Sequence, residues 1–212
     1  MISSARKKPD GYFYLGWVAA GSISLPIAWI ITLAVMSLIV NIVGSTIQVG
    51  GQTHITEDYL GFYILSPLIG LLSGLFQYAV LHDYFPRMRW WVAATFLGWL
   101  LPFVIFPYIF NFLAPILPPA SIGSMALVVV LLGSSIGLFQ WIVLRRQVRR
   151  AAWWILASIV GLGLPTLAVG ASISGTPDVL AVILLPPVIT CLAWRWLLVG
   201  RLAAAESAAG HL

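Results

Sequence analysis

Two glutamines and one arginine are the polar residues that lie deepest within the apolar stretches of this sequence. Gln77 and Gln140 each stand near the end of a long apolar run, and Arg195 stands within the last one. A buried amide can hydrogen-bond a neighbouring helix, and polar side chains inside a membrane often mark a solute pathway. The sequence therefore leaves two interpretations open. The three residues either join packed helices or form the rim of a polar cavity, with Arg195 able to extend its long side chain to the membrane surface.

Four glycines accompany the two glutamines at regular spacing. Gly70 and Gly74 form one Gly-x-x-x-Gly motif, and Gly133 and Gly137 form a second. Glycine lets two helix backbones approach closely, which is how helices gain packing energy in lipid. Each glutamine follows the second glycine of its motif by three residues, so it shares a helix face with the glycines. These residues are therefore candidates for helix packing or for lining a cavity.

No arrangement of nucleophile and base is evident in the sequence. Ser135 lies in a Gly-x-Ser-x-Gly pattern, and Cys191 lies four residues before Arg195. A serine or cysteine nucleophile needs a base within hydrogen-bond reach, whereas the three histidines are scattered at His54, His82 and His211. This scatter also lacks the clustering of a metal site. We predict no catalytic residue, metal or cofactor. An intramembrane enzyme stays a remote alternative, and it requires a base near Ser135 or Cys191.

The composition indicates which solvent surrounds these residues. The sequence is 61% hydrophobic and 8% charged, whereas a soluble domain carries about 25% charged residues. Such a chain must use lipid as part of its solvent. The net charge of +5 does not indicate a nucleic-acid partner, because the basic residues flank apolar segments. Their expected partners are the anionic head groups of membrane lipids.

Long uncharged segments predict an all-α, polytopic integral membrane protein. A helix needs about 20 apolar residues to cross the hydrocarbon core, and the uncharged stretch from Trp90 to Leu144 is long enough for two crossings. Pro115, Pro118 and Pro119 mark the turn between them. Continuous apolar runs favour helices over the alternating strands of a barrel. The expected transmembrane helices are 14–42, 58–83, 90–112, 121–145, 152–173 and 178–201.

The basic residues predict the orientation of the chain. All the arginines and lysines precede the first expected helix, follow the second or fourth, or end the sixth. The positive-inside rule then places both termini in the cytoplasm and the protein in the inner, cytoplasmic membrane as a multi-pass protein. Residues 1–12 form a cytoplasmic segment, and 13–201 form one transmembrane domain. The alanine-rich tail 202–212 is expected to be cytoplasmic and disordered.

An internal repeat organises the expected helices. Residues 68–102 align without gaps on residues 131–165, and the matches include Gly-Leu-Phe-Gln, a Trp-Trp pair and a proline. Shared hydrophobicity does not explain matched glutamines, tryptophan pairs and prolines together. A fainter copy starts at Trp17, and another precedes Val199. The expected units are three helix hairpins that run in parallel, at about 13–86, 87–149 and 150–201.

The Gly-Leu-Phe-Gln-Trp-Ile-Val-Leu-Arg segment at 137–145, with its copy at 74–81, resembles segments repeated in uncharacterised bacterial polytopic membrane proteins. This resemblance covers about half of the chain. It implies a fold type and no function.

The tryptophans give further expectations about packing. Indole rings favour the membrane interface. We therefore expect six tryptophans at the cytoplasmic interface, namely Trp90, Trp91, Trp153, Trp154, Trp194 and Trp196. Trp29 and Trp99 are expected to lie deeper, as packing residues.

Two functions remain in competition. The leading hypothesis is a non-enzymatic accessory or assembly subunit that packs its glycine-lined helices against other membrane subunits or a second copy. The main alternative is a small-solute or ion transporter or channel. It predicts a wet cavity at Gln77 and Gln140, with helices broken around it at Pro26, Pro102 and Pro165.

Overall fold

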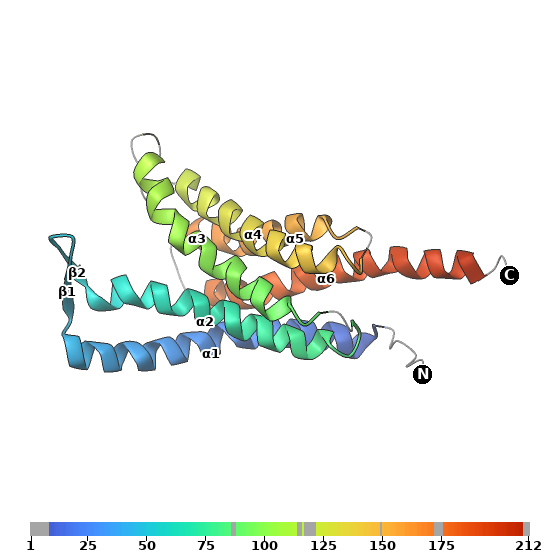
Figure 1. The fold of residues 1–212 in the computed structure, drawn as a ribbon, viewed down its shortest axis with the longest axis horizontal. Helices are drawn as coiled ribbons and strands as arrows, with labels where there is room; N and C mark the ends of the chain where they lie inside the picture. The colour runs from blue at the N-terminus through green and yellow to red at the C-terminus, as the bar shows by residue number, and fades with distance from the viewer. Residues whose placement is uncertain are drawn as a thin grey trace.

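A computed structural model of the protein describes residues 9–85, 88–113, 116, 122–148, 150–171 and 176–209. These residues form six helices and one β-hairpin (Figure 1). The elements are α1 Gly11–Val43, β1 Thr46–Val49, β2 Gln52–Ile55, α2 Thr56–Leu81, α3 Trp91–Leu113, α4 Ile122–Leu144, α5 Trp153–Ala171 and α6 Thr176–Ala209. The prediction of a mostly helical chain with six helices is confirmed. Helix ends differ by a few residues, except that α6 continues to Ala209, where a disordered tail was expected.

Three helical segments of the described chain are long and apolar enough to cross a membrane, namely Gly11–Val43, Tyr59–Leu81 and Ala126–Leu144. Shorter apolar stretches lie at Trp91–Phe106, Trp153–Pro165 and Val182–Leu198. Over its whole length α3 has 23 residues, which is about 35 Å at the helical rise and exceeds a hydrocarbon core of about 30 Å. These lengths are compatible with a membrane protein.

A small β-hairpin between α1 and α2 was not expected from the sequence. Strands β1 and β2 pair antiparallel, from Thr46 opposite Ile55 to Val49 opposite Gln52. Gly50 and Gly51 form the turn with φ angles of 59° and 80°, a left-handed conformation that glycine adopts without strain and that two-residue hairpin turns favour. The Gly-Gly pair between two short strand-like segments was a signal for this hairpin.

The helices form a closed ring. Each helix packs against its neighbours along the chain, and α6 also packs against α1. Glycines allow close approach at several of these contacts, of which the α2–α3 and α4–α5 contacts are examples. A Cβ atom at Gly74 in α2 would lie 3.0 Å from the Cα atom of Val92 in α3, and one at Gly137 in α4 would lie 2.7 Å from the Cα atom of Ile155 in α5. Both pairs place one helix directly on the backbone of the next.

Prolines do not break the helices around the ring. Pro26, Pro102 and Pro165 lie inside α1, α3 and α5, which run continuously through them. The expectation of broken helices is therefore wrong. Neighbouring helices and hydroxyl side chains are the usual means by which an intramembrane helix tolerates proline.

The start of α1 and the end of α6 lie at the same end of the ring, which we call the terminal end, and the β-hairpin lies at the opposite end (Figure 1). Buried aromatic side chains fill the terminal end. We call the four central ones, Trp17, Trp91, Trp154 and Trp194, the tryptophan layer. Every pair of these rings has centroids 5.0–6.5 Å apart, so each indole contacts the other three.

The expectation that six tryptophans face the membrane interface is wrong for three of them. Trp90, Trp153 and Trp196 are exposed, whereas Trp91, Trp154 and Trp194 are at most 1% exposed. Adjacent helical residues point about 100° apart, so one member of each Trp-Trp pair faces outward and the other faces the ring interior. Trp29 is 52% exposed, so its expected packing role is also wrong.

Asp10 joins the start of α1 to the segment after α2. Its Oδ1 atom accepts hydrogen bonds from the backbone N–H of Phe13 at 3.0 Å and from the Tyr84 hydroxyl at 3.1 Å. Asp10→Ala should lower the free energy of unfolding by about 1–2 kcal/mol, since it removes a helix cap and a bond to a buried tyrosine. Thermal unfolding in detergent measures the loss. Asp83→Ala is the control, because Asp83 is exposed and its one ion pair among the described residues is with the adjacent His82. Equal losses would contradict the role given to Asp10.

Candidate ligand cavity

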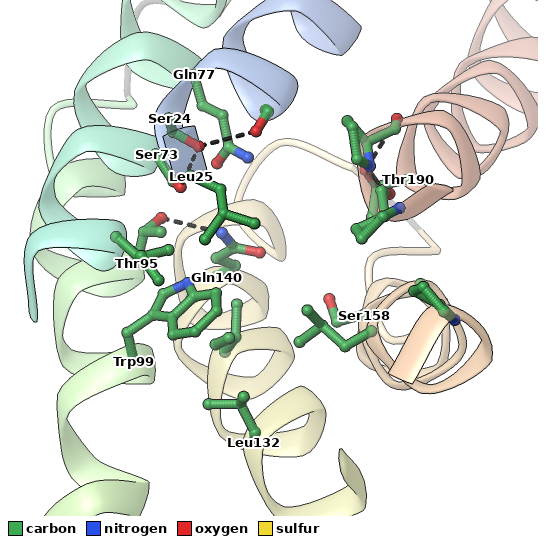
Figure 2. A pocket seen from close by; sticks show the side chains of 18 of the residues that line it. Ser24, Leu25, Ser73, Gln77, Thr95, Trp99, Leu132, Gln140, Ser158 and Thr190 are labelled. Carbon is green, nitrogen blue, oxygen red and sulfur yellow. Dashed lines mark hydrogen bonds between the residues drawn. The ribbon is translucent and has the colours of Figure 1, made fainter. Parts of the chain in front are cut away.

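A cavity of about 250 Å³ lies inside the ring, and all six helices contribute side chains to it. Its apolar wall includes Leu25, Trp99 and Leu132 (Figure 2). Its polar groups are hydroxyls and amides from every helix, namely Ser24, Ser73, Gln77, Thr95, Gln140, Ser158 and Thr190. The lining is therefore mainly apolar, with neutral polar groups placed around it.

Gln77 and Gln140 both line the cavity and both bind a neighbouring helix. The Gln77 Oε1 atom accepts a hydrogen bond from the Trp91 indole at 3.0 Å, and the Gln140 Oε1 atom accepts one from the Trp154 indole at 2.7 Å. The Gln140 Nε2 atom also donates to the Thr95 hydroxyl at 2.9 Å. The Gln77 Nε2 atom has no hydrogen-bond partner among the described residues. The Gln77 amide thus keeps free N–H donors, whereas both polar atoms of the Gln140 amide are hydrogen-bonded.

A third indole makes an equivalent bond where the ring closes. Trp17 in α1 donates its indole hydrogen to the Thr190 hydroxyl of α6 at 3.1 Å. In each of the three cases a tryptophan near the start of an odd-numbered helix binds the preceding helix in the ring. The three bonds tie the tryptophan layer to the cavity wall, and Trp17 and Trp154 belong to both. The layer thereby closes the cavity toward the terminal end.

The serine hydroxyls of the wall donate to the protein. Ser73 donates to the Ser24 hydroxyl at 2.8 Å, and Ser24 donates to the Gly21 carbonyl at 2.8 Å. Ser158 donates to the Trp154 carbonyl at 2.9 Å. A hydroxyl oxygen has two acceptor positions, so these groups keep acceptor capacity toward the cavity while their hydrogens are already used.

The four glycine candidates lie at helix contacts and do not line the cavity. Gly70 faces Phe96 and Trp99 across the α2–α3 contact, and Gly133 faces Ile159 across the α4–α5 contact. Gly74 and Gly137 occupy the same two contacts one helical turn further on. The sequence predicted that each glutamine shares a helix face with its glycines, whereas the glycines lie at helix contacts and only the glutamines line the cavity.

Arg195 does not belong to the cavity rim that the sequence suggested. Its side chain is exposed, and it does not line the cavity. The preceding residue, Trp194, points into the ring and is fully buried. Aligning the last helix one residue differently would have placed the tryptophan, and not the arginine, on the inner face.

Most of the hydroxyl groups and the tryptophan layer were not identified from the sequence. Thr95, Ser158 and Thr190 are single hydroxyls on apolar helices, a pattern too common to be diagnostic. The tryptophans carried a usable signal, because Trp91 and Trp154 each follow a repeat glutamine by 14 residues. That shared spacing predicts a pair that recurs in both copies.

Ser135 and Cys191, the two possible nucleophiles, have no base beside them in the part of the chain that the structure describes. The Ser135 hydroxyl is buried and has no hydrogen-bond partner among the described residues, so nothing is in place to take its proton. The Cys191 thiol faces the carbonyl of Tyr14 at 3.8 Å. No group of three or more His, Cys, Asp or Glu residues in the described chain is arranged to hold a metal ion. Within the described ranges, therefore, Ser135 and Cys191 have no base in place and no metal-binding group is assembled.

Comparison of the chain with protein-family models, with curated proteins and with solved structures finds no match.

Proposed function

We propose that this protein is an integral membrane protein with six membrane-spanning helices that binds a small solute in its central cavity. The observation that carries the proposal is the cavity itself, which all six helices enclose and whose polar groups converge from every helix. A packing subunit needs no such space, because close-packed interiors leave few voids larger than a water molecule. Concave, mainly apolar cavities with a few placed polar groups are typical of small-molecule sites.

The arrangement of charge supports insertion with both termini in the cytoplasm. The segments that connect α2 to α3 and α4 to α5 carry arginines at the terminal end, and Glu57 lies at the hairpin end. Three arginines stack on indoles, with Arg89 over Trp90 at 5.8 Å, Arg145 over Trp141 at 5.1 Å and Arg150 over Trp196 at 5.4 Å. Exposed tryptophans with arginines fit a cytoplasmic interface with anionic lipids. A labelled terminus on the outer surface of intact cells would contradict this orientation.

Equivalent contacts support three repeated hairpins. The approach of Gly74 to Val92 corresponds, 63 residues later in the sequence, to that of Gly137 to Ile155. The pair formed by Gln77 and Trp91 likewise corresponds to the pair formed by Gln140 and Trp154. One segment of sequence thus builds the same junction twice, and the Trp17–Thr190 bond occupies the third junction.

The lining favours solute binding over ion conduction or catalysis. Among the described residues that line the cavity, none is acidic, basic, histidine or cysteine. An ion moved from water into such a wall would lose its hydration without a charged partner, at a cost of many kcal/mol. Acid–base and nucleophilic steps also need groups that this wall lacks.

An assembly role is a second candidate, and the length of α1 favours it. The 33 residues of α1 span about 50 Å, against a hydrocarbon core of about 30 Å. At its hairpin end, Leu38, Ile42 and Val43 are 61%, 75% and 56% exposed. Apolar side chains that extend past the core would favour burial against another membrane subunit or a second copy. Cross-linking at Ile42 in membranes tests this role.

Two serines of α2 test the cavity directly. In a Cys191→Ala background, we expect Ser73→Cys to react with N-ethylmaleimide at least tenfold faster than Ser66→Cys. Both serines are buried, at 7% and 3% exposure, but only Ser73 lines the cavity. Ser66 donates to the Trp99 carbonyl at the α2–α3 contact. Mass spectrometry of purified protein over time measures both rates.

The two serine positions lie seven residues apart, about two helical turns, and so share a face of α2. Equal rates would mean that reactivity reflects general loosening of the helix. No reaction at Ser73→Cys would mean that no solute reaches the cavity, and the proposed function would fail.

A further inference from the structure

We infer that the cavity binds a neutral, largely apolar molecule that carries one hydrogen-bond acceptor, and that the Gln77 amide nitrogen donates to this acceptor. The inference rests on the proposed function and names its ligand class. The inference depends on one feature: the Gln77 amide keeps a free N–H donor at a cavity whose wall is mainly apolar.

Of the two amides, Gln77 is the one with only one of its two polar atoms hydrogen-bonded to the described part of the protein. Gln140 is 3% exposed, and both of its polar side-chain atoms bind protein groups, Thr95 and Trp154. Gln77 is only partly buried, and its oxygen alone is paired, with Trp91. Its Nε2 atom keeps two N–H donors. A ligand acceptor at that atom would complete the arrangement that Gln140 already has within the protein.

The orientation of the Gln77 amide is fixed by Trp91. Indole nitrogen can only donate, so the glutamine oxygen must face it. Flipping the amide would place two donors against each other. The NH₂ group must therefore take the other position. In Figure 2 the Gln77 side chain lies among the polar groups that surround the cavity. A fixed donor selects a molecule with an acceptor, such as a carbonyl or ether oxygen.

The rest of the wall selects an apolar body of moderate size. Leu25, Trp99, Leu132 and Ile136 lie around the same space. An apolar cavity of about 150 Å³ in another protein holds benzene, so the cavity of about 250 Å³ here has room for a ring with a short substituent. The absence of charged groups from the lining disfavours charged molecules. Aromatic ketones have the required size, neutrality and acceptor.

Protection of an engineered thiol gives a direct measurement of cavity occupancy. The parent protein carries Cys191→Ala and Ser73→Cys, and N-ethylmaleimide reports on the thiol. Acetophenone, ethylbenzene and benzylammonium are added as probes of similar size. We expect acetophenone to half-protect the thiol at a concentration about fivefold lower than ethylbenzene, as for one hydrogen bond. Benzylammonium should give no protection at these concentrations.

Two further variants assign the preference to the Gln77 donor. Adding Gln77→Leu should reduce the fivefold preference for acetophenone to about one. Adding Trp91→Phe removes the indole that orients the amide but keeps the amide donor, so the preference should fall below fivefold and stay above that of Gln77→Leu. Partitioning of each probe into detergent is the same for all variants, so it cancels when the preference of one variant is divided by that of another. If Gln77→Leu is not recovered folded, Gln77→Met keeps a straight side chain and removes the donor.

The outcomes separate the ligand class from the cavity itself. Equal protection by acetophenone and ethylbenzene in the parent would overturn the inference. A preference that survives loss of the Gln77 amide, or stronger protection by benzylammonium, would overturn it as well. A thiol that labels but that no probe protects would reject this ligand class and leave the cavity standing. A thiol that does not label at all would reject the proposed function.

Discussion

Replacing Trp154 with alanine should lower the free energy of unfolding by about 3–5 kcal/mol, the usual range for a buried tryptophan. The ring is 1% exposed and contacts the indoles of Trp17, Trp91 and Trp194. Its loss leaves a large void in the tryptophan layer. It also removes the donor that binds the buried Gln140 oxygen, and an unpaired buried acceptor adds to the cost. Unfolding in detergent, followed by circular dichroism, measures the change.

The adjacent Trp153 provides a matched control. Trp153 is 54% exposed, so Trp153→Ala removes the same side chain from the outer face of α5. We expect a loss of less than about 1 kcal/mol for that change, as for most surface substitutions. Similar losses for the two variants would mean that the tryptophan layer is not a structural core.

Gly133→Ala should be among the most disruptive single-methyl changes in the ring. A Cβ atom at Gly133 would lie 2.6 Å from the Cα atom of Ile159 in α5. A backbone atom cannot relieve this clash by changing rotamer, as a side chain could. Helices α4 and α5 must therefore separate, at a cost of about 1–3 kcal/mol for overpacking. Helix propensity alone would favour alanine over glycine by up to about 1 kcal/mol, so a net loss identifies the contact as the cause. Unfolding in detergent measures it.

Gly161 in α5 is the control for this prediction. Its nearest neighbour, the Pro186 carbonyl oxygen, would lie 3.5 Å from an added Cβ atom, an ordinary van der Waals contact. Gly161→Ala should therefore be neutral or stabilising. A stabilised Gly133→Ala variant would show that α4 and α5 do not pack as described.

The sequence predicted the helices well because their signals are local. Uncharged runs bounded by arginines or prolines identify the helices whatever they pack against. The β-hairpin was missed because its strands are only four residues long, and the long apolar run before them dominated the interpretation. Its Gly-Gly turn was visible in the sequence and was not used.

The candidate site was predicted only in part, because inward and outward positions on an all-apolar helix look alike. In a soluble helix, polar residues mark the outer face. In our interpretation lipid surrounds the helices in place of water, so apolar residues suit both faces. Tryptophan therefore occurs on the outer face at position 153 and on the inner face at position 154. Gln77 and Gln140 were found because amides are rare on such helices. The hydroxyl of Thr190 and the inward position of Trp194 depend on how α6 meets α1, which no local pattern encodes.

The contact between α6 and α1 closes the ring, so the packing does not depend on the helix hairpin at which the chain starts. In a row of three hairpins, the first and last would each keep one uncovered side, and the middle one would be distinct. In the closed ring, every hairpin has two neighbours, and the start of α1 and the end of α6 lie toward the same end of the ring. A circularly permuted gene that began at α3 and joined α6 to α1 would encode the same set of interfaces. Genetic rearrangement of this kind changes connectivity without changing the packed assembly.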